Sequence, residues 1–414
     1  MAPAAPMPSP GEFEPDDYEE VNEAYFQDLL RRRSWAALPA GWHNPHSAAA
    51  EHFLPPRLTS RDHQQYALDE GGALGATKKA IVELASRWEG RSLLEDEVTL
   101  CPSVSSANLA ILCAMRRRGV ERIVFETPAY FATPEQARLL GFEIDRIPSA
   151  RADDFDAPIE KFTNAAHSGG RSALWLTQPR FGIGKDQALS RIKELAAALG
   201  ERHVLVLDEA GEQRHPSHLS GLGDVGCDVV RARGVTKGVG LNGLRISMVL
   251  HPRHWRDDLE RVLETAGASI DRYSLMSAAE LASSPLLLPA MLRAANHQVC
   301  TARQALDRIL LGSWATPTPL ENSYIGSVLL DLSTLPGTYA DQRSALLAVC
   351  RDLRMPVVLR ASIGFAFDPA WEAIRMNYFT PEENVVETGR MLNLAHGLIS
   401  ARLAQTQPIP RGHS

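Results

Sequence analysis

A lysine set among small residues is the first sign of chemistry in this sequence. Lys237 lies in the segment RGVTKGVGLNGLR, and Arg245 follows it eight positions later. Upstream, the apolar run HVLVLDEAG places an acid, Asp208, at the tip of an expected strand. A lysine amine can form a Schiff base, and an arginine fork suits a phosphate dianion. A carboxylate in a low-dielectric site keeps a ring nitrogen protonated, so these three residues are the parts needed to hold pyridoxal phosphate.

The bulk composition is that of an ordinary globular protein. The 414 residues are enough for two or three domains, or for one large domain with a smaller one packed on it. A net charge of −7 does not point to nucleic acid or anionic membranes as partners. The longest apolar runs are too short to span a bilayer, and the N-terminus lacks the features of a signal peptide. Five scattered cysteines without a C-x-x-C pair indicate reduced thiols, so we expect a cytoplasmic protein without a metal site.

Strands and helices are expected to alternate from about residue 98 to residue 250. Near-continuous apolar strands such as SALWLTQP and HVLVLDEAG are separated by helical patterns such as DQALSRIKELAAALG. This alternation predicts an α/β fold with a doubly wound, mostly parallel sheet. Ligands in such sheets bind beyond the carboxyl ends of the strands. After residue 250 the pattern is mostly helical and then mixed, which predicts a smaller α+β domain.

Further motifs stand in order around the lysine. PSVSSANLAIL turns from a strand into a helix and offers Ser105, Ser106 and Ala107 at the helix start. Amide groups and the helix dipole make such a start favourable for an anion. FETPAYF supplies Tyr130, whose ring face could stack on a cofactor, and WEAIRMNYF supplies Arg375, which could orient a carboxylate.

In their order and spacing these six motifs resemble the class I and II aminotransferases, which are fold-type I pyridoxal-phosphate enzymes. The likeness runs from about Tyr66 to about Leu403. It implies the aspartate-aminotransferase-like fold, with a large cofactor-binding domain, a small C-terminal α+β domain, and a homodimer whose sites lie at the interface. We accordingly expect a disordered lead at 1–20, a segment at 21–70 that packs on the small domain and the dimer partner, the large domain at 71–295 and the small domain at 296–414.

The resemblance also implies roles for individual residues. Lys237 and Asp208 are the expected catalytic residues, and Arg375 is expected to hold the substrate α-carboxylate. Tyr66 resembles a tyrosine that reaches across the dimer interface to the cofactor phosphate of the other subunit. The full expected set of cofactor contacts is Lys237, Asp208, Tyr130, Ser105, Ser106, Ala107, Arg245, Tyr66, Thr236 and Phe181.

Three positions depart from the family pattern. Phe181 stands where the family has an asparagine bound to the cofactor's phenolic oxygen, and Gln178 or Arg180 could replace it. Gly211 stands where a tyrosine binds the same oxygen, and Gly234 replaces a serine that binds the phosphate. Losing both oxygen ligands should change the electronics of the bound cofactor, and two glycines should leave a wider site.

Several functions are compatible with these residues. The first is an aminotransferase acting on an L-amino acid. The second is an enzyme of the same fold that performs elimination, replacement, cyclisation or carbon–carbon bond formation in specialised metabolism. The third is a non-catalytic protein with this fold. A nicotinamide-dependent dehydrogenase is excluded, since no strand is followed by a G-x-G-x-x-G that opens a helix.

Overall fold

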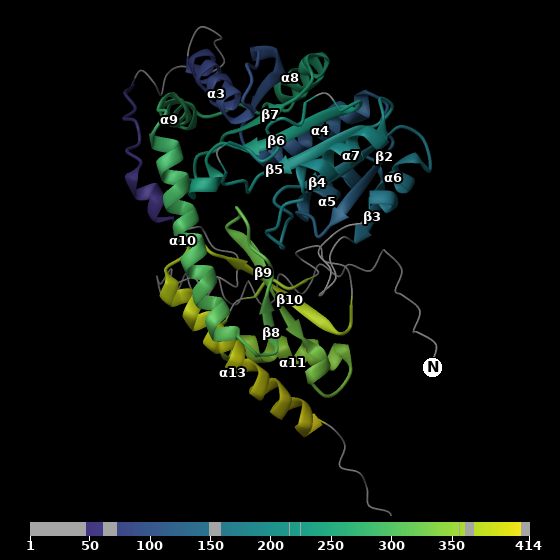
Figure 1. Ribbon diagram of the computed structural model, residues 1–414, viewed down its shortest axis with the longest axis vertical. Coiled ribbons are helices and arrows are strands. Elements are labelled where there is room, and N and C mark those ends of the chain that lie inside the picture. The colour runs from purple at the N-terminus through teal and green to yellow at the C-terminus, as the bar shows by residue number, and fades with distance from the viewer. Residues whose placement is uncertain are drawn as a thin grey trace, which may run out of the picture.

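The computed structural model describes residues 47–60, 73–148, 159–214, 216–223, 225–355, 357–360 and 368–406. Figure 1 shows two bodies, a large one around a seven-stranded sheet and a small one around a three-stranded sheet. The long helix α10 (Leu287–Leu310) runs down one side of both. The predicted boundary between residues 295 and 296 therefore falls inside this helix.

The large sheet has the strand order β1-β7-β6-β5-β4-β2-β3. Its strands are β1 (Val98–Cys101), β2 (Arg122–Thr127), β3 (Glu143–Pro148), β4 (Ser172–Thr177), β5 (Val204–Glu209), β6 (Asp228–Gly234) and β7 (Ser247–Leu250). The five strands from β3 to β6 pair in parallel, whereas β7 is antiparallel to both of its neighbours. The predicted α/β fold with a mostly parallel sheet is confirmed.

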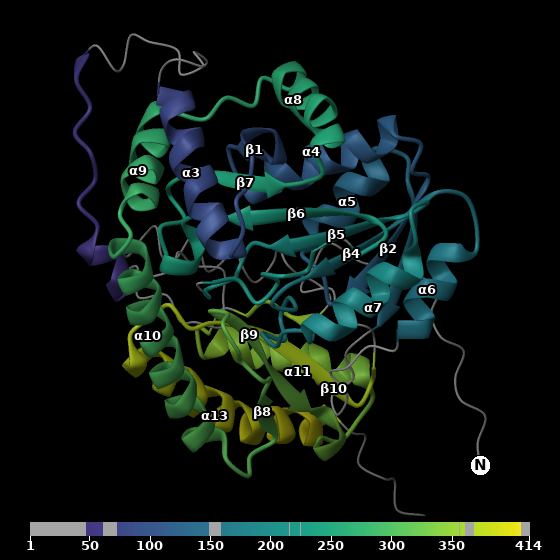
Figure 2. The ribbon, with the colours of Figure 1, turned by 45° about the horizontal axis from the view of Figure 1, so that its top comes forward.

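Helices cover both faces of the large sheet (Figure 2). One face is covered by α4 (Val104–Arg117), α5 (Ala132–Leu139) and α8 (Arg256–Thr265). The other face is covered by α6 (Ile159–His167) and α7 (Leu189–Leu199). On β5, Val206 packs on the α4 side, while Leu205 and Leu207 pack on the α6–α7 side. Each such buried side chain stabilises the fold by about 1.5–3 kcal/mol, so this alternation fixes the face on which the next residue, Asp208, lies.

Two more helices stand beside α10. α3 (Ala73–Glu89) packs along α9 (Arg272–Ser283) at the β1 side of the large sheet. Among the described residues no single helix has the length and apolar character needed to cross a membrane. The pair α9 and α10, which meet at a 93° bend, reaches those criteria only when counted together.

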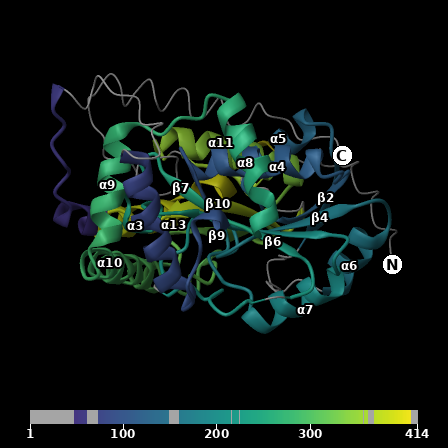
Figure 3. The same cartoon turned by 90° about the horizontal axis from the view of Figure 1, so that it is seen from above.

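The small body is an antiparallel sheet of order β10-β9-β8 with two covering helices. The elements are β8 (Ala315–Pro317), β9 (Ile325–Asp331), β10 (Trp371–Asn377), α11 (Tyr339–Asp352) and α13 (Glu382–Thr406). Seen from above in Figure 3, α13 lies along α10, and the two helices are in contact. In the described residues 357–360, whose apolar pattern predicts a strand, Leu359 forms an isolated bridge with Ile374, and the carbonyl oxygen of Val358 accepts the amide of Arg375.

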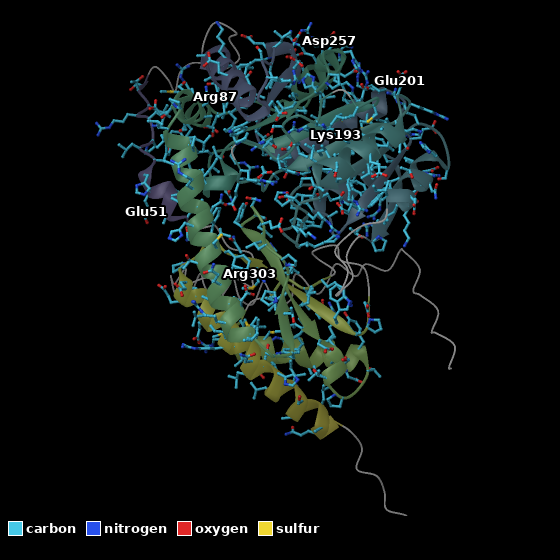
Figure 4. All side chains as sticks on the ribbon, viewed as in Figure 1. Glu51, Arg87, Lys193, Glu201, Asp257 and Arg303 are labelled. Atoms are coloured by element: carbon cyan, nitrogen blue, oxygen red, sulfur yellow. The ribbon has the colours of Figure 1, made fainter. Side chains whose placement is uncertain are left out.

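Short hydrogen bonds join α10 and the loop after β4 to the small body. Arg303 of α10, labelled in Figure 4, donates from Nη1 to the carbonyl oxygen of Thr318 at 2.6 Å. The amide of Glu321 donates to the carbonyl oxygen of Gly184 at 2.7 Å. Of the N-terminal segment, η1 (Ala48–His52) lies on α10, where the amide of Ala48 meets Gln298 Oε1 at 3.0 Å. Tyr66 lies outside the described residues.

Candidate active site

The chemically active side chains gather at the carboxyl edge of the large sheet. Asp208 is the last residue but one of β5 and pairs with Thr177 of β4 and Ala232 of β6. Lys237 follows the end of β6 and begins the single turn η3 (Lys237–Val239). The acid and the amine therefore come from neighbouring strands and reach the same edge, as the sequence predicted.

Asp208 is a buried carboxylate, 2% exposed, held by two hydrogen bonds. Asn108 of α4 donates from Nδ2 to Asp208 Oδ2 at 2.9 Å, and the amide of Ala210 donates to Oδ1 at 3.0 Å. Burial raises the pKa of Asp208, while the amide of Asn108 and the positive charge of Lys237 act in the opposite direction. Such a carboxylate gains stability from any further positive charge placed against it.

The loop that carries Lys237 is closely packed around its glycines. A β-carbon on Gly238 would lie 2.6 Å from the carbonyl oxygen of Glu212, and Gly240 has a φ of +79°. Gln213 donates from Nε2 to the carbonyl oxygen of Gly238 at 3.0 Å. Thr236, an expected cofactor contact, is buried beside the lysine, and its hydroxyl donates to the carbonyl oxygen of Leu244 at 3.3 Å. The lysine backbone is therefore firmly placed.

The sequence predicts an anion site at the start of α4, but some of the amide donors there form hydrogen bonds within the helix itself. Ser103 is the N-cap, and its Oγ accepts the amide of Ser106 at 3.1 Å. The amide of Ala107 donates to the carbonyl oxygen of Ser103 at 2.8 Å. These bonds use the backbone amides of Ser106 and Ala107. They do not use the amides of Val104 and Ser105, which also lie in the first turn.

Two of the expected contacts meet each other. Tyr130, half-buried after β2, lies edge-on to Phe181 with ring centroids 5.9 Å apart. Tyr130 also lies 5.0 Å from the ring of Phe131. The rings of these three residues therefore form an aromatic group between the end of β2 and the loop after β4.

Gln178 and Arg180, which could replace the missing asparagine, each contact other residues. Gln178 Oε1 accepts the amide of Gln187 at 2.9 Å, and Arg180 Nε lies 2.9 Å from Glu126 Oε1. Gln187 also donates from Nε2 to Glu126 Oε1 at 2.8 Å. On β2 the alternation from Val124 places Glu126 on the α6–α7 side, opposite to Asp208. Arg180 is thus held in a buried ion pair, whereas Gln178 Nε2 is buried without a hydrogen-bond partner among the described residues and keeps a free donor.

The expectation of a wider site holds at one glycine and is wrong at the other. A β-carbon on Gly211 would meet only Ser323 Oγ, at 3.8 Å, which is ordinary contact. A β-carbon on Gly234 would lie 3.2 Å from the carbonyl oxygen of Ala210. The backbone and the lysine fill the space that Gly234 was expected to leave.

The two predicted arginines occupy different surroundings. Arg375 lies in the middle of β10, 4% exposed, opposite Ser327, and its amide donates to the carbonyl oxygen of Val358 at 3.0 Å. Arg245 is exposed just before β7, and its amide donates to Ser274 Oγ at 3.0 Å. Arg375 therefore belongs to the small sheet, and Arg245 lies beside a strand of the large sheet.

The chain is similar to proteins of one known enzyme family. The sequence model of the family described as aminotransferase class I and II matches residues 68–319. The chain belongs to the class I and II aminotransferases. The cofactor of this family is pyridoxal phosphate.

Individual relatives of this aminotransferase family member are distant. A histidinol-phosphate aminotransferase from Halorubrum lacusprofundi is 29% identical over 182 residues, which are 44% of this chain and 48% of the relative. The chain thus spans about half the length of the curated relatives it matches. An aspartate aminotransferase of Thermus thermophilus superposes with a TM-score of 0.72 and 19% identity, over 93% of this chain and 97% of the other. A protein of Escherichia coli with a reported methionine aminotransferase function gives 0.72 and 17%, over 95% and 100%. These structures share the fold.

Sequence reasoning missed a group of charged residues beside the aminotransferase site. Asp186, Glu212 and His218 place their ligand atoms within 4.8 Å of one another, a spacing that could hold a metal. Arg214, however, lies 2.6 Å from Asp186 Oδ2 and 2.9 Å from Glu212 Oε2, and so supplies the positive charge. Asn322 of the small body completes the group with a 3.5 Å bond to Asp186.

The two carboxyl groups of this cluster, Asp186 and Glu212, have pKa values shifted in opposite directions. Burial raises the pKa of Asp186 to about 6, against the opposing effect of His218 and Arg214. Burial would also raise the pKa of Glu212, but hydrogen bonds from His218 and Arg214 lower it to about 2. No spacing in the sequence identifies the group, because its members come together only where the loops after β4 and β5 meet the small body.

Proposed function

We propose that this protein is a pyridoxal-phosphate-dependent aminotransferase that acts on the α-amino group of an L-amino acid. The observation that carries the proposal is the buried Asp208 beside the amine of Lys237, at the carboxyl edge of the sheet, in a chain of the class I and II family. Ligands of open α/β sheets bind at this edge.

The residues present fit the cofactor. Asp208, buried with two neutral donors and the amine of Lys237 near it, suits a protonated ring nitrogen. The first turn of α4, with Ser105 and Ser106, and the exposed guanidinium of Arg245 suit the phosphate. Tyr130 suits the ring face, with Phe181 behind it. When bound, pyridoxal phosphate supplies an electron sink for a bond broken at the substrate α-carbon.

The chain's own residues then divide the work. The Nζ of Lys237 would hold the cofactor covalently and, once released, would take the proton from the substrate α-carbon and deliver it to the cofactor's former aldehyde carbon. The carboxylate of Asp208 keeps the ring nitrogen protonated. The guanidinium of Arg375 orients the substrate by gripping its α-carboxylate with two parallel hydrogen bonds.

We also propose a homodimer with sites at the interface, in which Tyr66 contributes to the phosphate of the other subunit. The exposed position of Arg245 supports this, because a phosphate-binding arginine gains from cover by a second chain. The free cysteines support a reducing compartment such as the cytoplasm. Light scattering of the purified protein tests the dimer.

The alternative is elimination, replacement, cyclisation or carbon–carbon bond formation at the same site. The departures from the family pattern at Phe181 and Gly211 favour it, because they would remove two polar ligands of the cofactor's phenolic oxygen. Gly211 adds room on the side of Ser323.

The test is incubation of the purified protein with single L-amino acids and 2-oxoglutarate. Aminotransfer predicts glutamate and the matching oxo acid in equal amounts. Ammonia and an oxo acid without glutamate would establish elimination instead. Conversion of no amino acid, with the cofactor bound, would favour a non-catalytic protein and contradict both.

A further inference from the structure

The side chain of Asn108 joins Asp208 of β5 to Thr133 of α5. Its Nδ2 donates to Asp208 Oδ2 at 2.9 Å and to Thr133 Oγ1 of α5 at 3.2 Å. Asn108 is 1% exposed and Thr133 is 2% exposed. Both amide hydrogens are thus directed to oxygen acceptors in a closed space.

We propose that Asn108 is a positioning residue that holds Asp208 as a carboxylate, in one orientation, against the ring nitrogen of the cofactor. The inference rests on the proposed function, since it concerns the residue that would meet that nitrogen. Thr133 fixes the other amide hydrogen and so prevents the Asn108 side chain from turning over.

The chemistry of the amide explains why this residue type suits the task. A side-chain amide donates a hydrogen bond but does not give up its proton, so Asn108 lowers the pKa of Asp208 against the effect of burial. Carboxylate oxygens do not donate, and a flipped Asn108 would turn its own Oδ1 toward Asp208. The amide of Ala210 occupies Oδ1 of Asp208. The carboxylate is therefore held at both oxygens by neutral donors, in an orientation that can accept a proton-bearing group of the cofactor.

The location of Asn108 adds a second consequence. The residue lies in the second turn of α4, whose first turn carries Ser105 and Ser106. One helix therefore contacts both ends of the proposed cofactor, the phosphate end directly and the ring nitrogen through Asp208.

The experiment compares two ligands that differ at one ring atom. Dissociation constants of pyridoxal phosphate and of its 1-deaza analogue, which has carbon in place of the ring nitrogen, are measured by absorbance titration of the full-length protein. Asn108→Leu should weaken binding of pyridoxal phosphate by roughly 10- to 100-fold, since a hydrogen bond to a charged group is lost. Binding of the deaza analogue should change by less than about twofold, because the analogue has no ring N–H group that could donate a hydrogen bond to Asp208.

Asn108→Ala provides a smaller variant in case the leucine variant does not fold. It also removes the donor to Asp208 Oδ2, so this variant should also lose pyridoxal phosphate selectively. The control is Ser172→Ala, which removes a buried polar contact at the opposite end of β4, with a 2.7 Å bond to His203. It should leave both constants unchanged.

Equal weakening of both ligands by the Asn108 variants, or no weakening, would overturn the inference, because a merely structural residue affects both alike. Failure of the proposed function looks different. In that case the unmodified protein itself does not bind pyridoxal phosphate, or binds it without dependence on Lys237.

Discussion

Gly234 and Lys237 lie so close that a β-carbon on the glycine would come within 3.3 Å of the lysine's own Cβ. On the other side the same atom would be 3.2 Å from the carbonyl oxygen of Ala210, which belongs to the turn after Asp208. The end of β6 is therefore packed between the two residues that carry the proposed chemistry. A side chain at this position cannot be added without moving one of them.

Gly234→Ser should consequently destabilise the protein rather than restore a phosphate ligand. Overpacking of this kind costs about 1–3 kcal/mol, measured as a fall in the free energy of unfolding in urea. Gly243→Ser is the matched control, because a β-carbon there meets nothing within 4 Å. A serine variant of full stability that binds the cofactor more tightly would contradict the packing argument.

Lys237→Ala should abolish the visible absorbance that pyridoxal phosphate gains when it is bound to a lysine, while the far-ultraviolet circular dichroism stays unchanged. The fold does not depend on this amine, since the loop is held by Gln213 and by its glycines. Lys193→Ala on the outer surface of α7, labelled in Figure 4, is the control and should keep the absorbance. A yellow Lys237 variant would show that another amine holds the cofactor.

The fold could be predicted because its signals are local. Apolar strands such as residues 204–207 are buried on both faces, and the helical periods between them leave few alternatives to a parallel sheet. The apolar residues 357–359 pair less regularly. Leu359 forms an isolated bridge with Ile374 of β10, and the carbonyl oxygen of Val358 accepts the amide of Arg375, without a continuous ladder.

The site could be predicted only where a residue's own segment places it. Asp208 and Lys237 stand at strand ends, so their edge of the sheet follows from the sequence. Asn108 could not be found this way, because its partner is 100 residues away and a lone asparagine in a helix has many other uses. The crowding at Gly234 depends on a carbonyl group of the neighbouring chain segment, which no residue pattern encodes.

Arg375→Lys should raise the KM for the amino acid by roughly 10- to 100-fold, because a lysine cannot grip a carboxylate with two parallel bonds. Cofactor affinity should stay unchanged, since Arg375 lies in the small sheet. Arg390→Lys on the exposed side of α13 is the control. An unchanged KM in the Arg375 variant would place the carboxylate elsewhere.

Asp186→Asn should stabilise the protein more at pH 7 than at pH 5. Burial raises the pKa of Asp186 to about 6 from an ordinary value of 3.8, so the folded protein favours the protonated form. The contribution of Asp186 to stability therefore falls as pH rises from about 4 through 6, and the neutral asparagine escapes that loss. By linkage the gain in unfolding free energy should be about 1 kcal/mol larger at pH 7.

Urea unfolding of the two proteins at each pH measures this difference. Asp257→Asn on the surface of α8 is the control, and its effect should be the same at both pH values. An equal effect of Asp186→Asn at pH 5 and pH 7 would mean that Asp186 is ionised at both. The 2.6 Å ion pair with Arg214 would then outweigh the cost of burial, and the group at Asp186, Glu212 and His218 would carry a fixed charge over this range.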